Sequence, residues 1–173
     1  DVIGYGEKFY TSPNIQGNCK ARLEGDKWII NGQKSAWISG GPIATVACVQ
    51  PQVDSSMGLA GWGFCFVPMN LEGVSKGKPV EKIGTRDLPQ GEIFFDDVRI
   101  PKKWMVVGPN EYVATWQALL ALAGLNVAIW ATGMARAAFE EAFKYARERV
   151  QGGKPLIEHY TTKQRLFDMF AKV

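Results

Sequence analysis

Short apolar runs separated by turn residues fill the first part of the chain, and this pattern predicts β-strands. Residues 1–107 contain 14 of the 19 glycines and 7 of the 9 prolines, and residues 108–173 contain the other 5 and 2. Dense turn residues between short apolar segments are typical of antiparallel β structure. The pattern predicts strands at residues 19–23, 27–30, 33–39, 45–50, 62–67 and 91–100.

One dipeptide in this part predicts a tight turn. Asn31-Gly32 lies between two predicted strands. Asn-Gly is the preferred sequence for a type I′ hairpin turn, in which both central residues need a positive φ. We therefore expect a hairpin that joins residues 27–30 to residues 33–39. Residues 1–18 are rich in Gly, Tyr, Asn and Pro, and we expect a long loop there.

The rest of the chain has a helical pattern. No proline occurs from Asn110 to Arg149, and the composition favours a helix. A helix of about 40 residues would be roughly 60 Å long, so it needs packing partners along its length. Two glycines and a proline within residues 152–155 would end it. A second helix is expected from Tyr160 or Thr161, with Thr161 or Thr162 as its N-cap.

Together these patterns predict an α+β chain. Residues 1–107 should form an antiparallel β-barrel or sandwich domain. Residues 108–173 should form a long helix and the start of a second helix, both belonging to an incomplete helical bundle. The chain begins at Asp1 without a methionine, and its last residues still follow a helical pattern. We therefore expect it to be a piece of a longer polypeptide.

Composition excludes several classes of protein. Hydrophobic residues make up 46% and charged residues 21%, which argues against a disordered chain. The formal net charge of +3 is too small for a typical nucleic-acid binder. The 3 cysteines show no Cys-x-x-Cys spacing and the chain has 1 histidine, which argues against a zinc site or a disulfide framework. Cys19, Cys48 and Cys65 lie on predicted strands, and we expect them in the core.

The long helix contains an uncharged stretch from Val113 to Ala135. Such a stretch of about 20 residues is long enough to span a bilayer. It also contains several polar residues and two glycines, and a helix buried on several sides of a bundle has the same composition. The bundle is the preferred interpretation. A β-barrel module attached to a membrane by this helix is the alternative.

An ordered series of motifs places the chain next to a known family. They include Trp37-Ile38-Ser39, Lys82-Ile-Gly-Thr-Arg86, Glu92-Ile-Phe-Phe-Asp-Asp-Val-Arg-Ile-Pro101 and Tyr145-Ala-Arg-Glu-Arg149. Further pieces lie at residues 24–34, 61–68, 71–75 and 133–138. From about Cys19 to its end, the chain resembles the acyl-CoA dehydrogenase family of flavoproteins. The resemblance implies the middle β domain and the first helices of the C-terminal bundle.

The resemblance also implies an activity and its cofactor. Members of the family use FAD to desaturate an acyl-CoA thioester between its α and β carbons. A glutamate removes the α-proton while the β-hydride passes to flavin N5. The implied partners are an acyl-CoA substrate, further subunits in a homodimer or homotetramer, and electron-transfer flavoprotein. The implied location is the cytoplasm, or the mitochondrial matrix in a eukaryote.

Four residues are candidates for contact with FAD on the strength of this resemblance. Trp37 would pack on the isoalloxazine ring, with Ile38 beside it, and Ser39 would offer its hydroxyl and backbone N–H near N5 and O4. The family has one residue between the lysine and the tryptophan, whereas here there are two, at 35 and 36. A β-bulge would absorb the extra residue. The alternative is that Trp37 is a core aromatic residue and Ser39 only ends a strand.

Arg149 is the fourth candidate. In the family the corresponding arginine contacts the FAD pyrophosphate of a neighbouring subunit, for which a guanidinium group is well suited. The alternative is a cation that stabilises the C-terminus of its helix. Two nearby positions depart from the family: Gly152 replaces an aromatic residue, and Tyr160 replaces a glutamine.

No catalytic base is visible in this chain. Some members carry a glutamate and an arginine on the long helix, and these positions align with Ala123 and Gly124. In most members the glutamate lies later in the bundle. The isolated chain is therefore expected to be inactive. A non-catalytic relative, or one with oxidase or monooxygenase chemistry, stays open. Tyr5, Phe9 and Tyr10, in the segment 2–18, are candidates for lining the substrate entrance.

Overall fold

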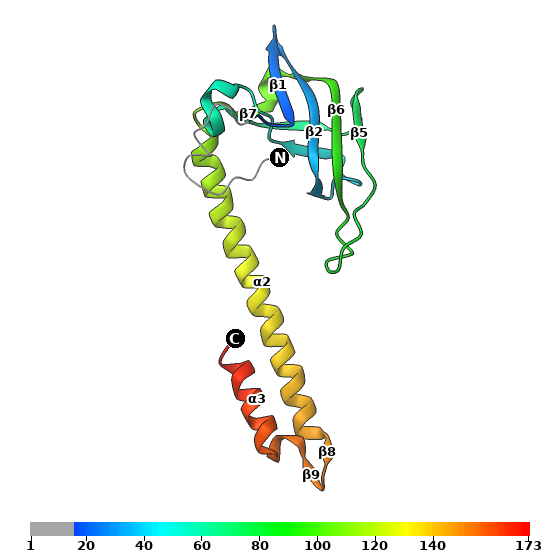
Figure 1. Ribbon diagram of the computed structural model, residues 1–173, viewed down its shortest axis with the longest axis vertical. Helices are drawn as coiled ribbons and strands as arrows, with labels where there is room; N and C mark the ends of the chain where they lie inside the picture. The colour runs from blue at the N-terminus through cyan, green and yellow to red at the C-terminus, as the bar shows by residue number, and fades with distance from the viewer. Residues whose placement is uncertain (1–15) are drawn as a thin grey trace. The chain divides into compact units, whose positions relative to one another are not determined.

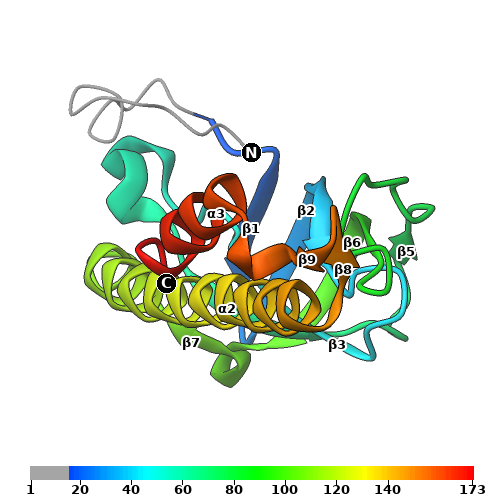
Figure 2. The same ribbon diagram turned by 90° about the horizontal axis from the view of Figure 1, so that it is seen from below.

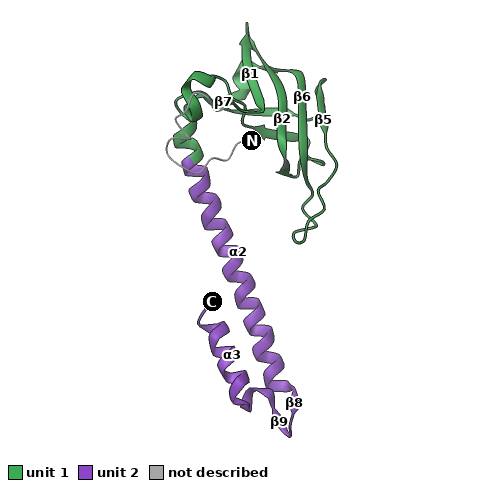
Figure 3. Cartoon of the chain, viewed as in Figure 1, with its two compact units in different colours: residues 1–116 green, residues 117–173 purple. Residues whose placement is uncertain are grey.

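The computed structural model describes residues 16–173, so Tyr5, Phe9 and Tyr10 lie outside the described residues. The chain divides into two compact units, residues 1–116 and residues 117–173, which are coloured separately in Figure 3. The first is built from antiparallel β-sheets and the second mainly from helices, which confirms the predicted α+β class. Each unit is described below on its own.

The first unit contains two antiparallel sheets. The larger sheet has the strand order β1-β2-β6-β5, and its strands stand side by side in Figure 1. These strands are β1 (Cys19–Glu24), β2 (Lys27–Ser39), β6 (Gln90–Pro101) and β5 (Val74–Lys76). The smaller sheet has the order β3-β4-β7. Its strands are β3 (Val46–Val49), β4 (Phe64–Pro68) and β7 (Met105–Val107), and the short 3₁₀ helices are η1 (Ser55–Gly61) and η2 (Lys102–Trp104).

Residues from both sheets form one apolar core. Strand β6 contributes Ile93, Phe95, Val98 and Ile100, all of them buried. The two-residue spacing expected of a strand with one buried face is interrupted once, between Phe95 and Val98. An extra residue in β6 explains the interruption, because Ile30 of β2 pairs with Val98 while Gly32 pairs with Phe95.

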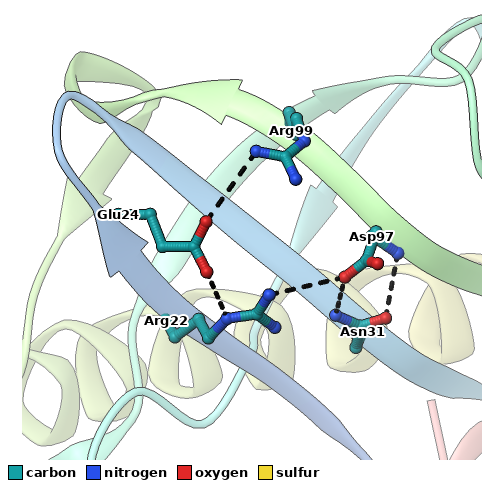
Figure 4. Close-up of polar contacts among 5 residues, drawn as sticks. All are labelled: Arg22, Glu24, Asn31, Asp97 and Arg99. Carbon is teal, nitrogen blue, oxygen red and sulfur yellow. Dashed lines mark hydrogen bonds and ion pairs between the residues drawn. The ribbon is translucent and has the colours of Figure 1, made fainter.

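Side chains on the outer surface hold this bulge in place (Figure 4). Asp97 has a φ of +46°, and its backbone N–H donates to Asn31 Oδ1 at 2.9 Å. Asn31 Nδ2 donates in return to Asp97 Oδ1 at 2.8 Å, and this hydrogen bond lowers the pKa of the Asp97 carboxyl. Arg22 links Asp97 to Glu24, and Arg99 lies 3.8 Å from Glu24. The network is exposed, so its main effect is on local geometry.

The predicted Asn31-Gly32 turn is wrong. Both residues lie inside the continuous strand β2, and the hairpin turns at Gly25-Asp26, because Glu24 pairs with Lys27. Gly25, with a φ of +62°, supplies the left-handed residue that this turn needs. Gly32 does have a φ of +109°, but it uses this conformation next to the β6 bulge and pairs there with Cys19.

The long helix is confirmed as α2 (Tyr112–Glu148) and the second helix as α3 (Tyr160–Phe170). Between them lie β8 (Val150–Gln151), β9 (Lys154–Pro155) and the 3₁₀ helix η3 (Leu156–Glu158). The two glycines between β8 and β9 have φ values of +63° and +80°, so they form a tight hairpin turn after the helix has ended. The N-cap of α3 is His159, so the prediction of Thr161 or Thr162 was wrong by two or three positions.

In the second unit, α3 lies beside the C-terminal part of α2 in both Figure 1 and Figure 2. Phe139 contacts Phe143 and Phe170, with ring centroids 5.8 Å and 5.7 Å apart. Many apolar residues of α2 are exposed, among them Leu122, Leu125 and Trp130. By length and composition alone α2 is long and apolar enough to cross a membrane, and the core helix of a soluble protein can have the same length and composition.

The three cysteines differ in exposure, which corrects the expectation that all three are core residues. Cys19 and Cys65 are fully buried, whereas Cys48 is exposed, because alternate residues of the strand β3 point away from the core. Burial raises the pKa of Cys19 to about 11, and it raises the pKa of Cys65 as well.

Only one thiol should therefore react in the folded protein. With Ellman's reagent, we expect Cys48 to react within minutes and the two buried thiols to react only after denaturation, since the thiolate is the reactive form. Cys48→Ser should remove the fast reaction and leave the two slow ones. Two fast thiols in the folded wild-type protein would contradict the burial of Cys19 and Cys65.

Candidate functional site

The end of β2 contains the bulge that the candidate site requires. Lys34 pairs with Ile93 and Ile38 pairs with Gly91, so four steps along β2 correspond to two steps along β6. The two additional residues of β2 are therefore accommodated between Lys34 and Ile38, and the pairing that follows is shifted by two residues. Strand β2 then resumes its ladder, and Ser39 pairs with Gln90.

The bulge places Trp37 and Ser39 at the surface and Ile38 against the core. Trp37 is 61% exposed and Ser39 is also exposed, whereas Ile38 packs against the buried core residues. Side chains two apart in a strand lie on the same face, so Trp37 and Ser39 form one small surface. Trp37 therefore presents an aromatic ring at the surface, and such a ring can stack on a flat ligand.

Gln90 of β6 fixes the backbone and the hydroxyl of this surface. Its Nε2 lies 3.0 Å from the carbonyl oxygen of Trp37 and 3.0 Å from Ser39 Oγ. A carbonyl oxygen only accepts hydrogen bonds, so the side-chain atom that faces it must be the NH₂ group. The bulge interrupts the ladder at Trp37, and the Gln90 side chain supplies a donor there.

A second pair of polar residues lies further along the same two strands. Gln33 Nε2 donates to Glu92 Oε1 at 2.7 Å, and both residues are partly buried. Glu92 is two residues from Gln90, so the two side chains share a face of β6. The carboxylate of Glu92 is therefore held by an amide donor close to the Trp37 surface.

Lys34 holds the bulge from the interior. Its Nζ donates to the carbonyl oxygen of Gln50 at 3.2 Å and lies 5.3 Å from the centroid of the Trp62 ring. Burial lowers the pKa of Lys34, because the charged ammonium loses hydration. The ammonium thus connects the part of β2 before the bulge to Gln50 and Trp62. These two residues lie close in sequence to β3 and β4 of the smaller sheet.

Arg149 lies directly after α2, in the second unit. Its backbone N–H donates to the Tyr145 carbonyl at 2.9 Å, and its own carbonyl accepts from the Leu156 N–H at 2.8 Å. The backbone is thus fixed on both sides, while the side chain is exposed. Within residues 16–173 the guanidinium makes no ion pair, so its donors are available to an anion.

The structure also shows where the residues that depart from the family pattern lie. Gly152 occupies the β8–β9 turn with a positive φ, which an aromatic residue rarely adopts. The His159 ring lies over this turn and its Nε2 is 2.9 Å from the Gln151 carbonyl oxygen. Ala123 and Gly124 lie in α2, where both are exposed, and Tyr160 begins α3 and is 79% exposed.

The groups at the end of β2 have the chemistry that a flat ligand with a polar edge, such as a flavin, would need. Trp37 offers an open ring face, and the Ser39 hydroxyl has its oxygen occupied by Gln90 while no described residue accepts its proton. Among residues 16–173, no three His, Cys, Asp or Glu side chains are grouped so as to hold a metal ion. Trp37, Ile38 and Ser39 thus form one surface in the first unit, and Arg149 is a separate candidate in the second.

Sequence analysis did not find Gln90. Gln90 lies in the middle of the segment Pro89-Gln90-Gly91, whose proline and glycine are typical of a turn before a strand. The pairing of Ser39 with Gln90 follows from the register of β2 and β6, which the two bulges shift twice. Only an exact count of both bulges would have placed Gln90 beside Trp37.

Two family profiles match the chain. The profile described as "Acyl-CoA dehydrogenase, middle domain" matches residues 11–98. The profile described as "Acyl-CoA dehydrogenase, C-terminal domain" matches residues 112–173. Both matches agree with the resemblance in motifs, and together they leave only short segments of the chain unmatched.

Similar proteins of known activity align over most of the chain. A 3-(aryl)acrylate reductase of Clostridium sporogenes is 35% identical over 153 residues, which cover 88% of this chain and 40% of that protein. The caffeyl-CoA reductase-Etf complex subunit CarC of Acetobacterium woodii is 32% identical over 149 residues, covering 86% of this chain and 39% of that subunit. The chain therefore spans about 40% of the length of the curated relatives it matches.

A solved structure shares the fold. Butyryl-CoA dehydrogenase from Megasphaera elsdenii superposes with a TM-score of 0.84 at 28% sequence identity. The match covers 94% of this chain and 44% of that one. The similarity therefore extends over both units of the chain.

Proposed function

Because the chain belongs to the acyl-CoA dehydrogenase family, we propose that it forms part of the FAD site of an enzyme that desaturates an acyl-CoA thioester. The observation that carries this proposal is the surface formed by Trp37 and Ser39 beside Gln90. The motif resemblance supports a flavin at this segment, and Trp37, which lies in the bulge of β2, is exposed enough for stacking.

The roles of these residues follow from their chemistry. FAD, when bound, supplies the acceptor for the hydride that leaves the β-carbon of the acyl group. Trp37 stacks on the flavin ring and orients it, and Ile38 anchors the strand in the core. The Ser39 hydroxyl would donate a hydrogen bond to the polar edge of the ring. A donor there stabilises the reduced state, which carries more negative charge.

Arg149 is proposed to bind the pyrophosphate of FAD in a neighbouring subunit. Its guanidinium is exposed and has no ion-pair partner among the described residues. An arginine forms paired hydrogen bonds with phosphate oxygens, so one side chain can hold this group. The proposal makes the site depend on a homodimer or homotetramer.

The catalytic base is proposed to lie outside this chain. Between Glu111 and Glu140, α2 carries no carboxylate, and the positions of the helix-borne pair are Ala123 and Gly124. The proton of the α-carbon would then be removed by a glutamate of another segment. Residues 1–173 alone should show no desaturase turnover.

The reverse direction is a second candidate function. The two relatives described above are both named reductases, and one belongs to an Etf complex. The same surface would serve reduction of an α,β-unsaturated acyl group, with electrons supplied by an electron-transfer flavoprotein. The cytoplasm, or the mitochondrial matrix in a eukaryote, is the proposed location.

The proposal is tested by FAD binding to the purified protein and to its Trp37→Ala and Trp37→Phe variants. Stacking of a flat heteroaromatic ring on an aromatic side chain contributes about 1–3 kcal/mol. Trp37→Ala should therefore weaken FAD binding roughly 5- to 150-fold. Trp37→Phe should retain most of the affinity, because it keeps a ring. Flavin fluorescence during titration reports the affinity.

Phe66→Ala is the matched control, because Phe66 is an exposed aromatic residue on β4, outside the proposed surface. It should bind FAD as the wild-type protein does. Equal affinities for the wild-type and Trp37→Ala proteins would remove Trp37 from the site. Absence of FAD binding by the complete polypeptide that contains residues 1–173 would refute the proposal as a whole.

A further inference from the structure

We propose that Gln90 is a positioning residue that makes the Ser39 hydroxyl a hydrogen-bond donor to the flavin. This inference rests on the proposed function, since it requires FAD at the Trp37 surface. Gln90 itself need not touch the flavin, because it acts through Ser39 and the backbone of Trp37. The argument depends on the direction of two hydrogen bonds.

The carbonyl of Trp37 determines the orientation of the Gln90 side chain. Its oxygen lies 3.0 Å from Nε2 and only accepts, so the NH₂ group must face it. The same nitrogen lies 3.0 Å from Ser39 Oγ. One amide N–H donates to each acceptor. The NH₂ group of an amide only donates, so it cannot accept the Ser39 proton.

The Ser39 hydroxyl is therefore constrained in one direction. A hydroxyl has one proton and two lone pairs, and Gln90 occupies a lone pair. The Ser39 proton cannot be donated back to the NH₂ group, and no residue within 16–173 accepts it. The O–H group points away from Gln90 and is available to a ligand on the exposed surface.

A hydroxyl fixed in this way differs from one that rotates freely. A free hydroxyl can act as donor or acceptor, so it adapts to both oxidation states of a flavin. A hydroxyl held as a donor favours the state with more negative charge, because its dipole needs no reorganisation. Gln90 should therefore raise the reduction potential of the bound flavin through Ser39.

The inference is tested by measuring the reduction potential of the FAD-bound protein in a double-mutant cycle. Gln90→Glu replaces the NH₂ group with a carboxylate oxygen, which accepts the Ser39 proton and turns the hydroxyl away from the flavin. Combining Gln90→Glu with Ser39→Ala removes that effect and leaves only the added charge. Comparing the shift in reduction potential caused by Gln90→Glu in the presence and in the absence of Ser39 separates the effect of the hydroxyl from the effect of the added charge.

With Ser39 present, Gln90→Glu should shift the ratio of reduced to oxidised flavin roughly ten- to a hundredfold toward the oxidised form at a fixed potential. In the Ser39→Ala protein the shift should be several times smaller. Gln90→Met, which adds no charge, should produce a smaller shift in the same direction that also depends on Ser39. Gln33→Met is the matched control, since it removes an amide that bonds to Glu92 and not to Ser39.

The possible results distinguish a failure of the inference about Gln90 from a failure of the proposed function. Equal shifts by Gln90→Glu with and without Ser39 would show that only charge acts, and would overturn the inference while FAD binding stands. If Gln90→Glu does not fold, an unchanged potential in Gln90→Met has the same meaning. Failure of the complete polypeptide that contains residues 1–173 to bind FAD would instead refute the proposed function, and the inference with it.

Discussion

Replacing Gly32 with alanine is expected to unfold the β unit or to lower its free energy of unfolding by about 3–6 kcal/mol. A Cβ at this position would lie 1.8 Å from the carbonyl oxygen of Asn18, which is a backbone atom and cannot rotate away. The φ of +109° adds strain for any residue with a Cβ. A loss of this size is comparable with the whole stability of a domain.

Two other glycines separate the cost of the close contact from the cost of the positive φ. Gly25→Ala keeps a φ of +62° but meets no atom within 4 Å, so it should cost only about 1–2 kcal/mol. Gly84→Ala has no positive φ and open space around it, so its effect should be close to zero. Chemical denaturation of the three variants measures the differences. If Gly32→Ala costs no more than Gly25→Ala, the contact between Gly32 and Asn18 is not as close as described.

The same glycine shows how far the sequence predicts this fold. Strand positions followed from apolar alternation, because that pattern is local and directly reflects which residues are buried. The Asn31-Gly32 turn was wrong because a positive φ has more than one use. Here Gly32 lies inside a strand, opposite a bulge of the partner strand β6 and against the Asn18 carbonyl. Such a contact between distant segments has no local signal.

In the candidate site, too, the residues within one segment were identified from the sequence, and a contact between distant segments was missed. Trp37, Ile38 and Ser39 were identified as one segment by resemblance, and their exposure and burial fit a strand with one buried face. Gln90 was missed because its contact depends on two register shifts between β2 and β6. The role of Arg149 stays a prediction, because it depends on a ligand from another subunit.

Truncating Tyr112 is the second large effect that we expect. The Tyr112 ring is buried, with its centroid 5.0 Å from that of Phe64 and 6.3 Å from that of Trp116. Its hydroxyl donates to Gln50 Oε1 at 2.9 Å. Tyr112→Ala removes the ring and the hydrogen bond, and should lower the free energy of unfolding by about 3–5 kcal/mol. Tyr112→Phe keeps the ring and should cost about 0.5–1.5 kcal/mol.

The pH dependence of the Tyr112→Phe difference tests whether Tyr112 is buried as described. Burial raises the pKa of the Tyr112 phenol above its ordinary value of 10.0, so the unfolded state loses this proton first. The stabilising effect of Tyr112 is therefore complete below that value and declines as the pH rises above it. Urea denaturation of the wild-type and Tyr112→Phe proteins at about pH 8 and pH 11 should show their difference in stability shrinking at the higher pH. A difference that stays constant would mean that the phenol titrates equally in both states, as an exposed tyrosine does.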